Sequence, residues 1–362
     1  MTGVCSAITA ARAGVKVILV QDRPVLGGNA SSEVRLWVLG ATSHMGNNNR
    51  WSREGGVLDE ILVENTFRNK EGNPVLFDMV LMDKVLAEPN ITLLLNTVVY
   101  KVEKDDDRTI GRLTAINPQN GTEYTLEGRL FADCTGDGTL GYLAGASFRM
   151  GAEEKEEYGE GFAPDKREYG ELLGHSILFY MKDTGRPVKY TAPDLAIKDA
   201  ERHIPKLQNP NYFNPAQHGC KYWWLEYGGR LDTVTDTERI KFELWRVVYG
   251  VWDYIKNSGK FPQAENLTLE WAGLFPGKRE SRRYVGDYIM TQHDVRAEGR
   301  FDDLIAYGGW SMDDHHPSGF RTTERPTIFH PAPSPYGIPY RSTYSRNIEN
   351  LMFAGRNISV TH

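Results

Sequence analysis

The first 28 residues constrain the fold more than any other part of the chain, because a helical pattern is followed at once by a buried-strand pattern. Residues 4–13 carry the small side chains of a helix that packs closely on a sheet, and Gly14 follows where a helix would end. Residues 15–20 are mostly β-branched, which indicates a strand buried on both faces. A helix joined so closely to such a strand is half of a βαβ crossover, so the sequence predicts an α/β fold with a parallel sheet.

Three residues of this stretch match parts of a dinucleotide-binding fingerprint. Gly3 stands where the third glycine of G-x-G-x-x-G would stand, and its missing side chain would let the helix lie close to a strand. The helix N-terminus would then face a pyrophosphate. Gln21 and Asp22 follow where the fingerprint has an acidic residue that binds ribose hydroxyls. An ordinary helix and strand without a nucleotide explain the same residues.

The segment Leu26-Gly27-Gly28-Asn29 favours the nucleotide. Together with the helix, the strand and Gln21, it resembles the FAD-dependent oxidoreductases that have a glutathione-reductase-like FAD domain. In that family the second strand ends in an acidic residue, and Leu-Gly-Gly follows after a few residues. The sequence departs from this pattern at Gln21, where glutamate is usual. A neutral amide should hold a diol less strongly than a carboxylate, and Asp22 could take over this role.

Two later segments extend the resemblance. The segment from Leu130 to Gly138 is a strand pattern that ends in a glycine-rich acidic turn, similar to the family's A-D-A-T-G-D segment. The segment from Asn350 to Ser359 resembles the last strand of the FAD domain. Without the family, the first segment is a strand followed by a helix that Asp137 caps, and Cys134 is a core residue. The resemblance implies these cofactor-binding residues: Gly3, Gln21, Asp22, Gly27, Gly28, Asn29, Asp133, Thr135, Gly136, Asp137, Gly355 and Arg356.

The resemblance also implies how the chain is divided. Residues 1–150 would form the first part of a glutathione-reductase-like, Rossmann-type FAD domain, residues 151–330 an inserted α+β substrate domain, and residues 331–362 the last FAD-domain strand. The elements expected from periodicity are helices over 56–67 and 77–87, a meander over 97–127, and a long helix opened by a capping box at Thr235 and Glu238. In this family a strand precedes Gly3 and a helix follows His362. Neither is in the given sequence, so we expect weak FAD retention.

A charged segment from Lys278 to Tyr288 contains candidate site arginines. Arg279 and Arg282 could bind an anionic substrate or stabilise a reduced, negatively charged flavin. The alternative is a solvated strand edge with surface ion pairs, which would contribute little to stability.

Three histidines are the candidate catalytic bases. His315 and His316 follow Asp313 and Asp314 directly, and a neighbouring carboxylate can orient an imidazole and raise its basicity. His44 lies in a loop that the resemblance places toward the flavin. A metal site at Asp313–His316 is the weaker alternative, because adjacent side chains point apart. A loop with a capping aspartate is the plain alternative.

Composition limits the partners. The net charge is -6 and Lys and Arg form no block, which argues against nucleic acid. No apolar stretch is long enough to cross a bilayer, so no membrane partner is expected. The three cysteines form no C-x-x-C pair and suit a reducing compartment, so a cytoplasmic location is favoured, with an upstream signal peptide left open. The oligomeric state is left open.

The sequence therefore predicts a flavoenzyme with FAD as cofactor and a small-molecule substrate. Hydride transfer to the flavin, with a histidine as base, would oxidise an organic substrate. The aromatic segment from Tyr222 to Tyr227 hints at a carbohydrate substrate, although core packing explains it equally. Two alternatives stay open. One is a non-redox carbohydrate-active lyase or hydrolase that uses Asp313, Asp314 or Glu280, and the other is an inactive fragment.

Overall fold

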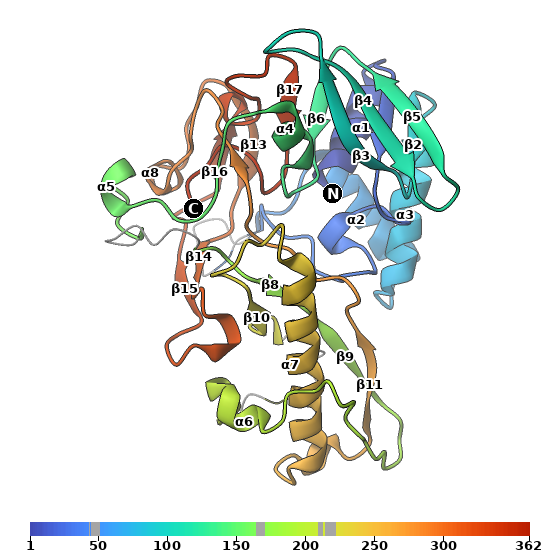
Figure 1. Ribbon diagram of the computed structural model, residues 1–362, viewed down its shortest axis with the longest axis vertical. Helices are drawn as coiled ribbons and strands as arrows, with labels where there is room; N and C mark the ends of the chain where they lie inside the picture. The colour runs from blue at the N-terminus through green and yellow to red at the C-terminus, as the bar shows by residue number, and fades with distance from the viewer. Residues whose placement is uncertain (43, 45–50, 164–170, 209–212, 214–221) are drawn as a thin grey trace.

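A computed structural model describes residues 1–42, 44, 51–163, 171–208, 213 and 222–362, and in these residues the chain has a mixed α/β fold. The upper part of Figure 1 holds both parallel strand pairs and an antiparallel meander. The lower part is built around one long helix.

Two parallel strand pairs form in the upper part. β1 (Val17–Val20) pairs with β2 (Ile91–Leu94), and β6 (Phe131–Asp133) pairs with β17 (Leu351–Phe353). The second pair joins segments that lie far apart in sequence, and the backbone N–H of Ala354 then donates to the carbonyl of Asp133 at 3.1 Å. The turns that follow β6 and β17 are therefore neighbours.

The helices of the upper part cover these strands as their apolar spacing predicts. They are α1 (Thr2–Arg12), α2 (Gly56–Arg68), α3 (Pro74–Leu86) and α4 (Thr139–Ala144). Buried side chains of α1 and α3, with Leu26, form one core cluster. Gly14 has a φ of 87°, a conformation that glycine adopts at low cost and that ends the first helix as predicted.

The predicted meander is present. It consists of β3 (Val98–Lys104), β4 (Ile110–Asn117) and β5 (Thr122–Glu127), all antiparallel. Gly121 has a φ of 72° in the turn between the last two strands. This left-handed conformation suits glycine and explains why the turn occurs there.

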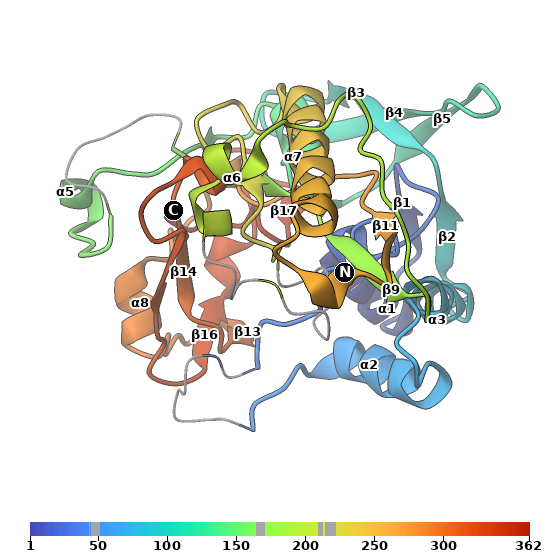
Figure 2. The ribbon, with the colours of Figure 1, turned by 90° about the horizontal axis from the view of Figure 1, so that it is seen from below.

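The lower part packs short strands against α7 (Thr237–Asn257). Both ribbon views place α7 between α6 (Ala200–His203) and the antiparallel pair of β9 (Phe179–Asp183) and β11 (Leu267–Ala272) (Figures 1 and 2). A second antiparallel pair joins β8 (His175–Ser176) to β10 (Glu226–Tyr227). The predicted capping box at Thr235 and Glu238 is wrong, because α7 begins at Thr237 and its N-cap Asp236 makes no side-chain cap. The Asp232 carboxylate instead accepts from the N–H groups of Val234 and Thr235 in the preceding turn.

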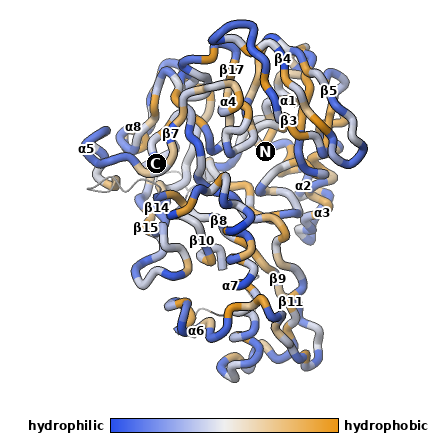
Figure 3. The backbone as a smooth tube through the Cα atoms, in the orientation of Figure 1, coloured by the Kyte–Doolittle hydropathy of each residue, from blue (hydrophilic) through white to orange (hydrophobic). Residues whose placement is uncertain are grey.

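The remaining elements link the two parts. They are β7 (Phe148–Arg149) paired with β12 (Arg283–Tyr284), β13 (Leu304–Gly308) with β16 (Tyr336–Pro339), β14 (Met312–His315) with β15 (Thr327–His330), and helices α5 (Lys155–Tyr158) and α8 (Gln292–Arg296). Figure 3 shows that α5 is hydrophilic, as its acidic composition predicts. Through β12, Tyr284 joins the core cluster of the upper part.

Candidate functional site

Three of the segments predicted to bind a dinucleotide meet at the first turn of α1. Gly3 packs on the end of β6, where an added Cβ would lie 2.9 Å from the Cβ of Cys134. A Cβ on Gly355 would lie 3.8 Å from Oγ1 of Thr2. The amino group of Met1 donates to the carbonyl of Gly27 at 3.2 Å. The positive end of the helix dipole is thus surrounded by three glycine-containing turns.

The backbone conformation at this place fits a cofactor that approaches the main chain closely. The φ angles are 105° at Gly27, 60° at Gly28, 79° at Gly136 and 110° at Gly355. A side chain would be strained at each of these positions, so the turns require glycine there. The Arg356 guanidinium lies against Gly136 and a methyl group of Leu81 against Gly27, whereas Gly28 is open. Glycines beside a helix N-terminus are the donor set expected for a pyrophosphate, and the residues present fit FAD.

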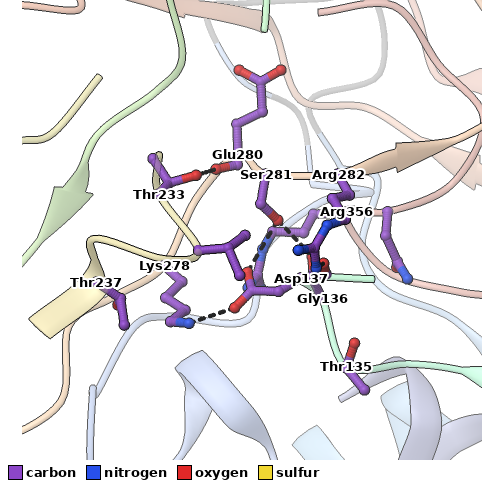
Figure 4. A network of polar contacts seen from close by, with 12 residues as sticks. Thr135, Gly136, Asp137, Thr233, Thr237, Lys278, Glu280, Ser281, Arg282 and Arg356 are labelled. Carbon is purple, nitrogen blue, oxygen red and sulfur yellow. Dashed lines mark hydrogen bonds and ion pairs between the residues drawn. The ribbon is translucent and has the colours of Figure 1, made fainter. Parts of the chain in front are cut away.

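Asp137 is the centre of a polar network next to this cradle (Figure 4). Its carboxylate forms ion pairs with Lys278 and, at 2.7 Å, with Arg356. Ser281 donates to the same carboxylate at 3.0 Å, and Arg282 donates to the backbone carbonyl of Asp137 at 3.1 Å. Residues from three distant segments are therefore held together by a single aspartate.

The network carries more positive than negative charge. Burial alone would raise the pKa of Asp137, but Arg356 and Lys278 lower it to about 2, so the carboxylate is ionised. The Asp137 carboxylate then faces two cations directly, with Arg282 beside them, and Asp22 also interacts electrostatically with Lys278. An additional anion next to Lys278 and Arg356 would complete the charge balance, and a diphosphate has that chemistry.

Asp133 and Thr135 hold the turn itself. The Asp133 carboxylate accepts from the backbone N–H groups of Thr135 and Gly141 and, at 2.6 Å, from the hydroxyl of Tyr284. The interpretation of Asp137 as the cap of α4 is wrong. The N-cap residue is Gly138, and it is Oγ1 of Thr135 that accepts from the N–H of Thr139. The Asp137 carboxylate instead forms ion pairs with Lys278 and Arg356.

The remaining predicted cofactor residues lie after β1. Gln21 donates through Nε2 to the carbonyl of Val25 at 2.9 Å, so its amide stabilises its own loop. Asp22 is exposed. Asn29 donates to the backbone carbonyl of Lys278 at 2.7 Å, which ties the Leu-Gly-Gly turn to the Asp137 network.

The charged segment at residues 278–283 is an interior segment, so its interpretation as a solvated strand edge is wrong. Ser281 is 1% exposed and Arg283 is 3% exposed. Arg283 forms an ion pair with Glu153 at 3.0 Å and donates to the carbonyl of Val360. Charged side chains are buried here because each one has a partner on another segment.

A cavity of about 590 Å³ lies beside the candidate bases. Its described lining residues are Ala152, Phe162, Glu171, Leu172, Arg230, Asp314, His315, His316, Pro317, Glu324, Arg325, Ile328 and His362. The cavity is thus formed by β14 and the turn after it, together with segments from both parts of the chain.

His315 is the most strongly held of the candidate bases. It is 3% exposed, and its Nδ1 lies 2.9 Å from the Glu226 carboxylate. Its Nε2 lies 2.9 Å from Nη2 of Arg279 and 3.0 Å from Oδ1 of Asp313. Burial lowers the pKa of His315, but Asp313 and Glu226 together raise it above the ordinary value.

The other predicted site residues differ from His315 in their surroundings. His316 lines the cavity, and its Nδ1 accepts from the N–H of Ser318 at 3.1 Å. His44 stacks on Trp310 at 3.9 Å between ring centroids and bonds to Ser311, and it is not among the cavity residues. Of its predicted loop, residues 42–49, only Thr42 and His44 are among the described residues. Arg282 lies over the ring of Tyr142 at 4.0 Å.

Several residues that complete the two sites were not singled out from the sequence. Glu226 and Lys278 hold the predicted residues in place, and His362 bonds to Glu280 at 2.6 Å beside the cavity. Lys278 contacts a residue 141 positions away, so no local spacing could have indicated it. The only local signal was that Lys278 and Glu280 belong to the same charged segment as Arg279 and Arg282.

The described residues also bear on two other kinds of site, metal sites and membrane-spanning helices. No group of three or more His, Cys, Asp or Glu side chains in them could hold a metal ion. Among the described helices, none has the length and apolar character needed to cross a membrane.

Comparison with known proteins gives one match over the whole chain. A family model described as FAD dependent oxidoreductase matches residues 1–362. None of the curated proteins matches. Among solved structures, p-nitrophenol 4-monooxygenase PnpA from Pseudomonas putida DLL-E4 is similar over 79% of this chain, with 13% identity and a TM-score of 0.33. The chain covers 66% of the length of that structure, and a similarity this weak supports no argument about the fold.

Proposed function

This chain belongs to the FAD-dependent oxidoreductase family, with FAD as cofactor, and on that premise we propose that it oxidises a small organic substrate in the cavity beside His315. One observation carries the proposal, namely that residues 278–282 contact both candidate sites. Lys278 and Ser281 bond to Asp137 in the glycine cradle, and Arg279 bonds to His315 at the cavity. The segment would therefore hold cofactor and substrate in one geometry.

The cradle at α1 is the place that we assign to the cofactor diphosphate. Gly3, Gly27, Gly28, Gly136 and Gly355 lie around this helix N-terminus. The backbone is open at two of them, because an added Cβ would meet nothing within 4 Å at Gly28 and no atom nearer than 3.6 Å at Gly355. Thr135 and Asp133 would position the turn, Gln21 would position the loop after β1, and the exposed Asp22 and the nearby Asn29 would reach the ribose side. Lys278 and Arg356 would balance the phosphate charge.

The pairing of β6 with β17 supports a glutathione-reductase-like FAD domain built from both ends of the chain. We propose residues 1–150 and 331–362 for this domain and residues 151–330 for the inserted substrate domain. Segment 283–290 contacts the first part, since Arg283 and Tyr284 pair with β7. The inserted domain would thus be anchored to the FAD domain before residue 330.

The protein side of the reaction would be carried by the cavity residues. When bound, FAD supplies the acceptor for a hydride that leaves a substrate carbon. Arg279 would give up its contact with Nε2 of His315, and the hydroxyl proton of the same carbon would pass to the freed lone pair, so that one C–H bond and one O–H bond break and a carbonyl forms. His316 would border the substrate, and apolar Phe162, Leu172 and Ile328 would restrict water.

We do not propose a carbohydrate as the substrate. Tyr222 is 2% exposed and Trp224 is 3% exposed, so these rings pack in the core of the lower part. Neither of these two rings offers an open face on which a sugar could stack, and the partly buried Trp223 between them in the sequence lies edge-on to His315.

The redox function is also favoured over a lyase or hydrolase. The Glu280 carboxylate bonds to His362 and forms an ion pair with Arg283, and Asp313 faces His315. Hydrolysis needs a pair of carboxylates that faces the substrate, and of the three carboxylates predicted for it from the sequence only Asp314 is among the described residues that line the cavity.

The test is substrate-dependent bleaching of the flavin band without oxygen. The chain loaded with FAD is mixed with a panel of small alcohols and hydroxy acids. We expect bleaching with the wild-type chain and at least a ~100-fold slower rate with His315→Gln. His203→Gln, which changes an exposed histidine in α6, is the control. Equal rates for His315→Gln and the control would show that His315 is not the base.

A further inference from the structure

The environment of His315 contains an unused hydrogen-bond acceptor. Three charged groups face the ring, namely Glu226 from β10, Arg279 from the segment before β12, and Asp313 from β14 itself. The edge of Trp223 closes a further side at 5.3 Å between centroids. Oδ1 of Asp313 is buried and has no hydrogen-bond partner, although it lies 3.0 Å from Nε2 of His315.

The contact with Arg279 fixes which ring nitrogen carries the proton in the neutral state. A guanidinium can only donate, so the 2.9 Å contact from Nη2 of Arg279 needs a bare lone pair on Nε2. The proton of the neutral ring is then on Nδ1, where it is donated to Glu226. Arg279 also donates to Glu226 at 2.9 Å, so the carboxylate orients both groups.

The contact with Asp313 fits the other protonation state. A carboxylate oxygen and a bare ring nitrogen are both acceptors, so they form no hydrogen bond with each other. Once Nε2 is protonated, it can no longer accept from Arg279 and can donate to Oδ1 of Asp313 without moving far. Nε2 thus has a hydrogen-bond partner in each protonation state, namely Arg279 when the ring is neutral and Asp313 when the ring is protonated.

From this geometry we propose that His315 is a two-state proton acceptor, in which Glu226 and Arg279 hold the neutral ring ready and Asp313 receives the protonated Nε2. The proposal deepens the proposed function and rests on it for the source of the proton, which is the substrate hydroxyl. Glu226, Arg279 and Asp313 are positioning residues, since each acts through His315. From the sequence, Arg279 was expected to bind an anionic substrate or to stabilise a reduced flavin. In the structure its guanidinium contacts Nε2 of His315, the candidate base.

Each charged neighbour should move the titration of His315 in a defined direction. Glu226 and Asp313 favour the imidazolium, whereas burial and Arg279 oppose it. Lys206 also lies close enough to Glu226 to interact with it electrostatically. Asp313→Asn and Glu226→Gln should therefore lower the pKa of His315, and Arg279→Met should raise it.

The test is an NMR titration of the histidine rings in the full chain without substrate, with nitrogen shifts to identify the tautomer. We expect a neutral ring protonated at Nδ1, a decrease of about one pH unit in Asp313→Asn, and an increase in Arg279→Met. His316 and His203 serve as internal controls whose titrations stay in place. A neutral ring protonated at Nε2, or an unchanged titration in Asp313→Asn, would overturn the proposal.

The result of the NMR titration can be distinguished from the result of the flavin-bleaching test of the proposed function. The titration needs neither flavin nor substrate, so it can succeed even where His315→Gln bleaches the flavin at the wild-type rate. If the NMR titration and the flavin-bleaching assay both give the expected results, Asp313→Asn should shift the acid limb of the pH profile of kcat/KM by as much as it shifts the pKa of His315 measured by NMR. If one of the variants fails to fold, the tautomer of the wild-type ring still decides the question.

Discussion

At the scale of single residues, Asp133 and Asp137 show how similar sequence positions take different roles. Both are carboxylates at the end of β6, and both were predicted to bind the cofactor. Asp133 is 0% exposed and accepts from backbone and tyrosine donors of its own neighbourhood. Asp137 instead neutralises Lys278 and Arg356, which come from segments far along the chain.

Replacing Asp137 should destabilise the fold in a pH-dependent way. Asp137→Asn leaves two partly buried cations without their partner, so we expect a loss of about 2–3 kcal/mol in the free energy of unfolding at pH 7. The pKa of Asp137 is about 2 in the folded chain against 3.8 for an ordinary aspartate, so its stabilisation is present above pH 4 and disappears as pH falls toward 2. Urea unfolding at several pH values measures both effects.

A matched control is Asp303→Asn, which breaks an exposed ion pair with Arg341. It should change the unfolding free energy far less than Asp137→Asn does. The account of the Asp137 network would be contradicted if the two variants lost the same stability at pH 7.

His175 should produce a second pH dependence, of opposite chemical origin. It is fully buried beside the carbonyl of Thr233, and burial lowers its pKa to about 4. The unfolded histidine binds a proton from about pH 6.5 downward, so folding loses about 3 kcal/mol between pH 6.5 and 4. His175→Gln should flatten this part of the stability profile, whereas the exposed His203→Gln should leave it unchanged. Parallel profiles for His175→Gln and wild type would refute the assignment.

The sequence predicts the residue types of the site better than their partners. Gly3 was predicted from its place at the start of the helix, and the other glycines of the cradle were predicted from the family resemblance. The ion pair between Arg356 and Asp137 spans 219 positions, so no periodicity could predict it. Glu226 likewise becomes a partner of His315 only when β10 and β14 are brought together by the fold, whereas Asp313 lies two positions before His315 on β14 and its contact was expected from the sequence.

At the scale of elements, the close approach of α1 to β6 determines the cradle. The Cβ of Cys134 fills the space that a side chain at Gly3 would need. The periodic elements α1, α3 and the meander were predictable because their apolar patterns are long. The two-residue strands β7, β8, β10 and β12 were not, since pairs this short leave no pattern and depend on the segments opposite them.

Gly3→Ala should therefore separate α1 from β6. An added methyl group 2.9 Å from the Cβ of Cys134 forces a shift, and we expect a loss of about 1–3 kcal/mol despite the better helix propensity of alanine. FAD affinity should fall as well, because the helix N-terminus moves. The control is Gly161→Ala, whose added Cβ meets its nearest neighbour at 3.6 Å. Thermal unfolding and FAD titration measure the two effects, and equal behaviour of both variants would argue against the close packing.

At the scale of the whole molecule, the fold places two chemically different regions on either side of one segment. The upper part provides the glycine cradle and its excess positive charge, and the cavity is lined by His315 of β14 and by the turn after that strand. Lys278, Arg279 and Ser281 connect them within four consecutive positions. A ligand that binds the cradle should therefore stabilise both parts together.

The most direct measurement is a titration of the chain with FAD, followed by thermal unfolding and flavin fluorescence. The account predicts saturable binding and a rising Tm, equivalent to about 2.7 kcal/mol at a concentration of 100 times Kd. Gly3→Ala should weaken this binding, and Gly161→Ala should not. A titration has the advantage that it detects FAD too weakly held to survive purification. An unchanged Tm and no saturable fluorescence change at any FAD concentration would contradict the assignment of the cradle to FAD.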